Sequence, residues 1–184
     1  ANVEKILIEI EDSRFFEHNG IDLKSIGRSI LSLSGKYRKK KGLLKSGGST
    51  ITMQLCRTLL IPSNQNIVNR KIVEVLLSFW CEKQFTKREI LNFYLTSVRF
   101  ETRINGIISA SKHFFSDIDK KDFSNEEAFF LIERLSNITS SYRLERIKYI
   151  CERISRTVEI NLESLLSIYE EQKMKGTITQ YNNV

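Results

Sequence analysis

Residues 11–20 read Glu11-Asp12-Ser13-Arg14-Phe15-Phe16-Glu17-His18-Asn19-Gly20. Apolar residues recur at helical spacing just before this stretch: Val3, Ile6, Leu7 and Ile10. We therefore expect Glu11 near the end of an amphipathic helix. A carboxylate that leaves a buried helix into an aromatic turn is partly withdrawn from water, which suits it to act as a general base. On local chemistry alone, an exposed acidic helix end with an aromatic anchor explains the stretch as well.

A glycine pair precedes the next predicted helix. The run Gly47-Gly48-Ser49-Thr50 leaves the backbone free to turn, and Ser49 or Thr50 can cap a helix whose free N–H groups suit a phosphate. Gln54 and Arg57 follow at one-turn spacing and extend a polar stripe along one face. Capped turns of this kind are common, so on its own this stretch is interpreted as structural.

The helix predicted over residues 68–85 is apolar nearly all round, which indicates a buried central helix. Arg70, Lys71 and Glu74 lie within one turn of its start. A charge in such a helix must be paired, and an Arg70–Glu74 ion pair accounts for Glu74 without any further function. Residues 86–89 then form a capping box, with Lys87 in a first helical turn, where a cation opposes the helix dipole.

Composition favours one mostly helical domain. The chain has 184 residues, one proline and a formal net charge of +7. It holds no apolar run of the ~18 residues that a membrane span requires. Three widely spaced cysteines, each in an apolar helical context, are interpreted as buried free thiols, with no disulfide framework and no zinc site. The basic balance indicates an anionic partner, which composition leaves open between nucleic acid, phospholipid headgroups and a phosphorylated substrate.

A basic run occupies residues 36–45, where six of ten residues are Lys or Arg and none is acidic. Like charges repel one another, so we expect a mobile loop. The loop is either simply solvated or in contact with an anionic membrane surface. Few aromatics interleave the basic residues, and no known binding motif surrounds them. Nucleic acid is therefore not an expected partner.

Four stretches, taken together in their order along the chain, resemble one family. They are residues 11–20, Gly47–Gln54, Arg70–Glu74, and the run Lys87-Arg88-Glu89-Ile90-Leu91-Asn92-Phe93-Tyr94-Leu95. In this order and at these separations they resemble the peptidoglycan glycosyltransferase (transglycosylase) family, which includes monofunctional transglycosylases and the polymerising domains of class A penicillin-binding proteins. The close resemblance runs from about Glu4 to Phe115 and is looser beyond.

The resemblance implies a mainly α fold, with a lysozyme-like helical lobe and a smaller, flexible, membrane-facing jaw lobe. We expect one glycosyltransferase domain over residues 1–184, with a mobile jaw segment over about 21–46 and scaffold helices over 117–184. The family's location is the extracytoplasmic (periplasmic) face of the cytoplasmic membrane. Its members usually carry an N-terminal membrane anchor, which we expect to be missing from the sequence given. An odd number of cysteines is unusual for an oxidising compartment.

The resemblance also implies an inverting glycosyltransferase that makes a β-1,4 glycan, the peptidoglycan strand, from a polyprenyl-diphosphate-linked saccharide. Glu11 matches the general base, which takes a proton from the acceptor's 4-hydroxyl, and Glu74 matches the second catalytic glutamate. Matching positions in the binding cleft and around the diphosphate are Asp12, Phe15, His18, Ser49, Thr50, Gln54, Arg57, Arg70, Lys71 and Lys87. The expected cofactor is Mg²⁺ or Mn²⁺ held by Glu74 or Asp12, with no organic cofactor. The expected partners are the lipid-linked saccharide, the membrane surface and cell-envelope proteins.

Several positions depart from the family pattern. Met53 replaces the family's usual glutamine, Arg57-Thr58 replaces a Lys-Asn pair, Thr96 replaces an asparagine and Ser116 replaces a glycine. Glu133-Arg134 lies where the family commonly has small residues. These departures leave two alternatives open. The product can be a different surface polysaccharide, or the chain can be a degenerate domain that binds lipid-linked glycan without turnover.

Overall fold

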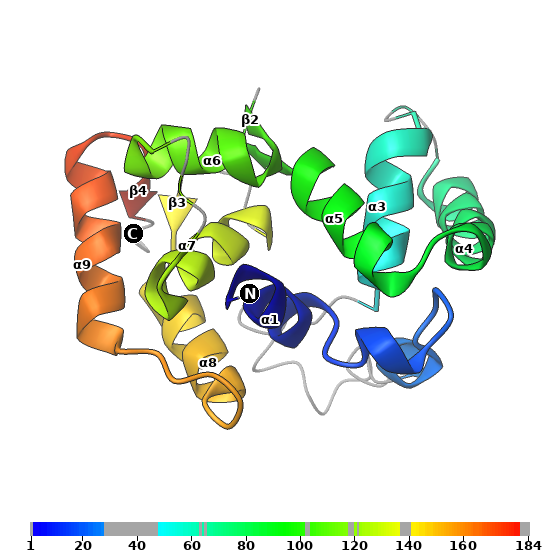
Figure 1. Cartoon of the computed structure of the whole chain (residues 1–184), viewed down its shortest axis with the longest axis horizontal. Coiled ribbons are helices and arrows are strands. Elements are labelled where there is room, and N and C mark those ends of the chain that lie inside the picture. The colour runs from blue at the N-terminus through cyan, green and yellow to red at the C-terminus, as the bar shows by residue number, and fades with distance from the viewer. Residues whose placement is uncertain are drawn as a thin grey trace. The chain divides into compact units, whose positions relative to one another are not determined.

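The computed structural model describes residues 2–27, 48–62, 64, 66–101, 104–117, 120, 122–136 and 141–180, with only the backbone given for Glu101, Ser136 and Gln180. The fold is mainly α, as predicted (Figure 1). The basic run over 36–45, and most of the expected jaw segment, lie outside the described residues. No described helix combines the length and the apolar character that a bilayer crossing requires.

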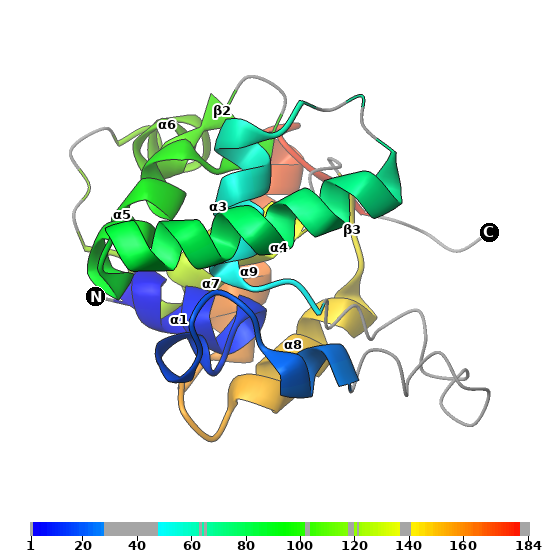
Figure 2. The same cartoon turned by 90° about the vertical axis from the view of Figure 1, so that its right-hand side faces the viewer.

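The chain divides into two compact units. The first is Glu11–Ser97, and the other combines Ala1–Ile10 with Val98–Val184. The first contains the 3-10 turn η1 (Phe15–Glu17), helical residues 23–27, and helices α3 (Ile51–Leu60), α4 (Ile67–Gln84) and α5 (Lys87–Ser97). Helix α3 packs against both α4 and α5, as Figures 1 and 2 show. The predicted bounds of α4, residues 68–85, are confirmed within one residue.

Local capping chemistry fixes where these helices begin. Asp22 accepts hydrogen bonds from the backbone N–H groups of Lys24 and Ser25, so it caps residues 23–27. The predicted capping box before α5 is present: the Glu89 carboxylate accepts from the Thr86 N–H at 2.8 Å, and Thr86 Oγ1 accepts from the Glu89 N–H. The Thr86 N–H and the Thr86 hydroxyl both donate to the Glu89 carboxylate, and these two hydrogen bonds hold the pKa of Glu89 below its ordinary value.

A glycine closes the stretch of residues 11–20 against α4. Gly20 has φ +94°, a left-handed conformation that favours glycine. A Cβ added there would lie 2.9 Å from the Ser78 carbonyl oxygen, closer than real side chains approach backbone. The turn can therefore lie against α4 only because position 20 has no side chain.

Helix α4 is not the buried central helix that its composition predicts. Its buried residues are Glu74, Ser78 and Cys81. Most of its large apolar side chains are exposed: Ile67, Val68, Ile72, Leu76, Phe79 and Trp80. The prediction was wrong because apolar residues show only that a helix face favours an apolar contact. They do not show whether that contact comes from the same protein.

The other unit contains α1 (Asn2–Glu11) up to Ile10, together with helices α6 (Gly106–Phe115), α7 (Asn125–Ser136), α8 (Leu144–Ile154) and α9 (Leu162–Met174). Helix α7 is its buried element, because every side chain from Ala128 to Leu135 is buried. It packs against α9, with the Phe130 ring 5.0 Å from that of Tyr169.

Two short strand pairs complete this unit. Strands β1 (Arg99–Glu101) and β2 (Ile104–Asn105) pair antiparallel, whereas β3 (Ser141–Tyr142) and β4 (Thr179–Gln180) pair in parallel. The sequence predicts no strands, because two or three residues are too few to show an alternating pattern.

The departure at residues 133–134 is a buried charge pair. Glu133 is fully buried and accepts from the neighbouring Arg134. Arg146 lies 3.4 Å from the second carboxylate oxygen, and the Tyr169 hydroxyl donates to Glu133 at 3.2 Å. Large charged residues occupy this site because they compensate one another inside the unit.

The cysteines are free thiols, as predicted. Cys56 and Cys81 are buried, and burial raises the pKa of Cys56 to about 12. Cys151 is only half-buried, which corrects the expectation that all three are enclosed.

Candidate active site

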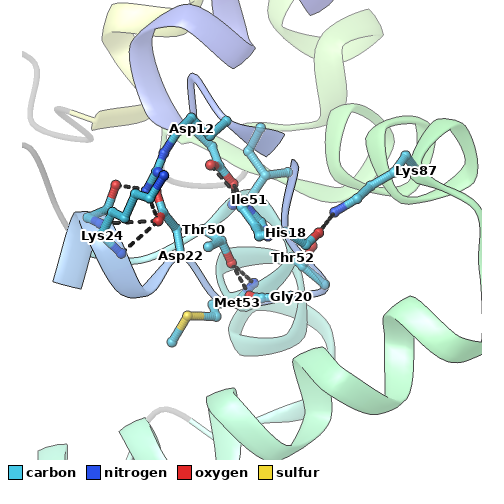
Figure 3. Close-up of polar contacts among 12 residues, drawn as sticks. Asp12, His18, Gly20, Asp22, Lys24, Thr50, Ile51, Thr52, Met53 and Lys87 are labelled. Carbon is cyan, nitrogen blue, oxygen red and sulfur yellow. Dashed lines mark hydrogen bonds and ion pairs between the residues drawn. The ribbon is translucent and has the colours of Figure 1, made fainter. Parts of the chain in front are cut away.

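Asp12 joins the stretch of residues 11–20 to helix α3. Its carboxylate is buried, and His18 Nε2 lies 3.0 Å from both of its oxygens. One of these oxygens also accepts the Ile51 N–H at 3.0 Å, at the first residue of α3 (Figure 3). An anion at a helix N-terminus is stabilised by the free N–H groups and the helix dipole. Asp12 therefore positions both His18 and the start of α3.

Thr50 fixes the same junction from the other side. Its hydroxyl caps α3 by accepting the Met53 N–H at 3.1 Å, and it donates to the Gly20 carbonyl at 2.6 Å (Figure 3). The prediction left the cap open between two residues, and the structure assigns it to Thr50. Ser49 instead accepts a hydrogen bond from Lys71 Nζ at 2.7 Å.

Glu11 is held by a side chain from the middle of α3. Gln54 Nε2 donates to the Glu11 carboxylate at 3.0 Å, and Gln54 Oε1 accepts from the Tyr94 hydroxyl at 3.0 Å. Burial, and then the negative charge of Glu11, raise the pKa of Tyr94 well above its ordinary value, while Arg57 opposes this. The Tyr94 hydroxyl therefore stays protonated and remains a donor.

A second charged group surrounds Glu74. This carboxylate is 1% exposed and lies 3.1 Å from Lys71 Nζ, 3.5 Å from Arg70 Nε and 3.6 Å from Arg57 Nη1. The Arg70–Glu74 ion pair that the sequence suggested is present, within a larger group. Three cations against one carboxylate leave a surplus of positive charge. We call Arg57, Arg70, Lys71 and Glu74 the cation cluster.

The cations of this cluster remain accessible to a ligand. Their side chains are between 33% and 43% exposed, whereas the carboxylate that holds them is enclosed. Glu74 therefore fixes the inner side of each cation, and the outer side faces solvent. Such an arrangement suits an anion with several oxygens, because guanidinium and ammonium groups bind phosphate oxygens through charge-assisted hydrogen bonds.

Helix α3 connects Glu11 to the cation cluster. Gln54, which bonds Glu11, and Arg57, which pairs with Glu74, are three residues apart and so lie on one face of the helix. Glu11 and Arg57 act on the pKa of the Tyr94 hydroxyl in opposite directions. The residue that bonds Glu11 and a residue of the cation cluster thus lie on adjacent turns of α3.

Lys87 belongs to a different set of contacts. Its Nζ donates to the His18 carbonyl and to Glu82 Oε1, each at 2.7 Å, and lies 4.3 Å from the centre of the Phe15 ring. Glu82 supplies the anion that offsets a cation in the first turn of α5. Phe15, His18 and Lys87 thus form one packed group, and their binding of substrate stays a prediction.

The two carboxylates considered for Mg²⁺ or Mn²⁺ do not fit a divalent cation as they are arranged. Asp12 is buried and already accepts from His18 and from the Ile51 backbone. Glu74 has one oxygen without a hydrogen bond among the described residues, but three cations surround it and would repel a metal ion. Among the described residues, no three His, Cys, Asp or Glu side chains lie together so that they could hold a metal ion. A metal requirement stays a prediction without an assigned ligand.

Sequence reasoning missed Tyr94 and Glu82 as members of this network. Tyr94 lies within a quoted stretch, but a tyrosine in an apolar helix predicts packing rather than a hydroxyl contact. Glu82 accepts from Thr52 Oγ1 at 2.5 Å as well as from Lys87. The packing of α3 on α5 brings Tyr94 to Gln54, and the packing of α3 on α4 brings Glu82 to Thr52, so no local pattern could have identified either residue.

Comparison with known proteins matches this chain to one family. The model of the family described as Transglycosylase matches residues 1–161. The chain is 38% identical over 126 residues to penicillin-binding protein 1A/1B of Bacillus subtilis, covering 68% of this chain and 13% of that protein. It is 32% identical over 173 residues to penicillin-binding protein 1A of Pseudomonas aeruginosa, covering 90% and 20%.

A shorter relative gives a similar result. The biosynthetic peptidoglycan transglycosylase of Nitrosomonas eutropha is 32% identical over 136 residues, covering 74% of this chain and 53% of that protein. The matched region therefore spans about half of this relative, and a fifth or less of the two penicillin-binding proteins.

Proposed function

The chain belongs to the transglycosylase family, and we propose that it polymerises a polyprenyl-diphosphate-linked saccharide into a β-1,4 glycan, the peptidoglycan strand. The observation that carries this proposal is the arrangement on α3. One face of this helix presents Gln54 bonded to Glu11 and Arg57 paired within the cation cluster. A transfer from a diphosphate needs a base and an anion site close together.

Glu11 is the base of the proposed reaction. It takes the proton from the 4-hydroxyl of the acceptor sugar while that oxygen bonds to the anomeric carbon of the donor chain. The bond between the anomeric carbon and the diphosphate oxygen breaks, and the electron pair leaves with the diphosphate. Attack on the face opposite the leaving group inverts the anomeric centre. A positioned general base contributes about 10²- to 10⁴-fold to the rate of such a step.

The cation cluster is the proposed site of the diphosphate. Charge builds up on the leaving oxygens as the bond breaks, and Arg57, Arg70 and Lys71 are already fixed by Glu74 to receive it. Groups placed in advance need no reorganisation during the reaction, which is the basis of electrostatic stabilisation. Glu74 acts in this proposal by holding the cations.

We propose that the protein works at the outer face of the cytoplasmic membrane. The support is the exposed apolar side of α4, where Ile72, Leu76 and Trp80 are each more than half exposed. Leu59 and Leu60 at the end of α3 are also more than half exposed, and α3 packs against α4 (Figure 2). A water-soluble domain gains nothing from such a surface, whereas a substrate with a polyprenyl tail is held in a bilayer.

The test is incubation of the protein with a lipid-linked disaccharide in detergent or vesicles, followed by sizing of the products. Parallel reactions contain Mg²⁺, Mn²⁺ or EDTA, which reports the metal requirement directly. Growth of glycan chains supports the proposal. Turnover only with a different lipid-linked saccharide assigns another surface polysaccharide, and tight binding without turnover under every condition assigns a binding domain.

A further inference from the structure

We propose that Tyr94 is a positioning residue, whose hydroxyl holds the Gln54 side-chain amide in the orientation that donates a hydrogen bond to Glu11. This inference rests on the proposed role of Glu11 as general base. The residues come from three separate elements, the end of α1, the middle of α3 and α5. We call them the Tyr94–Gln54–Glu11 relay.

The hydrogen-bond inventory allows one direction through the relay. An ionised carboxylate can only accept, so the Gln54 NH₂ group must face Glu11, at 3.0 Å. The amide oxygen then faces Tyr94, also at 3.0 Å, and a carbonyl oxygen can only accept. Tyr94 must therefore donate. Its single hydroxyl proton fixes which end of the amide meets Glu11.

The environment of Tyr94 keeps that proton in place. The residue is 1% exposed, so its ring cannot swing away into solvent. Burial and the Glu11 charge raise the pKa of its hydroxyl, and Arg57 is the cation that opposes them. Tyr94 thus stays a donor over the pH range in which a carboxylate base works.

Removal of this hydroxyl has a specific consequence. In Tyr94→Phe the Gln54 oxygen loses its donor, and the amide is free to rotate and present its oxygen to Glu11. The carboxylate then loses the hydrogen bond that Gln54 donates. We expect kcat to fall about 10-fold, the size of one lost hydrogen bond at a reacting group. We expect KM to stay within about twofold, because the cation cluster is unchanged.

The other unit offers a matched control. Tyr142 is fully buried, and its hydroxyl bonds a single carboxylate oxygen, Glu170 Oε1, at 3.2 Å. Tyr142→Phe therefore removes the same atom from a buried ring outside the relay, and we expect no larger a loss of stability because its partner Glu170 is an exposed carboxylate. Turnover at a temperature where both variants are folded should be unchanged in Tyr142→Phe and reduced in Tyr94→Phe.

A double-mutant cycle separates positioning from general damage. If Tyr94 acts only through the amide, Tyr94→Phe has no further effect on kcat in a Gln54→Leu background. A second loss of the same size in that background would show that Tyr94 acts by another route and would overturn the proposal. So would a Tyr94→Phe kcat within about twofold of the wild type.

The relay also has a readout that needs no substrate. The side-chain amide protons of Gln54, identified by their absence in Gln54→Leu, should exchange slowly with deuterium in the wild type. Their protection should be lost in Tyr94→Phe and kept in Tyr142→Phe. Loss of protection in Tyr94→Phe, together with a wild type that shows no turnover, supports the relay and refutes the proposed function. Unchanged protection in Tyr94→Phe overturns the relay, whatever the activity.

Discussion

Lys71 and Glu74 form an ion pair in which the ammonium group is open to solvent and the carboxylate is not: Nζ lies 3.1 Å from Oε2, and the two side chains are 43% and 1% exposed. Surface ion pairs usually contribute little, because both partners are well solvated alone. Here the anion is enclosed and the cation is only anchored by it. Such a pair is better suited to hold a cation ready for another anion than to stabilise the fold.

Lys71→Met should weaken binding of the diphosphate substrate. A charge-assisted hydrogen bond contributes about 1.5–3 kcal/mol, so we expect KM for the lipid-linked donor to rise about 10-fold or more. Lys175 is the control, because it pairs with Glu171 on the surface of α9 with similar exposure. Lys175→Met should leave KM unchanged. Steady-state kinetics on both variants test this prediction. A KM of Lys71→Met equal to that of Lys175→Met would show that Lys71 does not bind the diphosphate.

Glu74→Gln should destabilise the protein and make it depend on an added anion. The substitution leaves three cations around a neutral, buried amide. Removing one partner of a fully buried ion pair costs about 3 kcal/mol or more, and we expect less here because the three cations are between 33% and 43% exposed. Thermal unfolding should show a lower Tm, and inorganic pyrophosphate should restore part of it because it binds only the folded cluster. A Tm that pyrophosphate raises equally in the wild type and the variant would contradict this role.

Gly20→Ala should be strongly destabilising, because the new methyl group meets both a left-handed φ and the Ser78 carbonyl oxygen. Two glycines separate these effects. Gly176 has φ +73° with open space around it, and Gly27 has open space and no such φ. We expect the largest loss of Tm for Gly20→Ala, a smaller one for Gly176→Ala and almost none for Gly27→Ala. The reverse order would show that the turn does not lie against α4 as described.

The capping residues could be predicted from sequence, because caps are local. Thr50, Asp22 and the Thr86–Glu89 box each satisfy backbone groups within three residues. The Arg70–Glu74 pair was likewise visible in the i, i+4 spacing. In each case the physical cause lies within one helical turn.

The relay and the full cation cluster could not be predicted, because tertiary packing creates them. Gln54 and Tyr94 are forty residues apart and meet only where α3 packs on α5. Arg57 joins Glu74 in the same way, through the contact of α3 with α4. The prediction that α4 is a buried helix was wrong for the opposite reason. Its apolar residues predict a contact, and most of their large side chains are exposed in the part of the chain that the structure describes.

The exposed side of α4 should bind lipid. Leu76→Glu places a charge among apolar side chains, and we expect less of the variant to float with anionic phospholipid vesicles. Ile108 on α6 provides the control, because it is 61% exposed against 63% for Leu76. Ile108→Glu should float like the wild type. Equal flotation of all three proteins would mean that α4 does not contact the membrane.

The most direct test of the account is turnover by Glu11→Gln. The substitution keeps the size and the polar contact of the side chain but removes its ability to accept a proton. Glu17 is an exposed carboxylate of the same stretch, so Glu17→Gln is the matched control. With the lipid-linked disaccharide as substrate, we predict that Glu11→Gln keeps the wild-type Tm and loses at least about 100-fold in kcat, while Glu17→Gln keeps its activity. Glycan chains produced by folded Glu11→Gln at the wild-type rate would contradict the account.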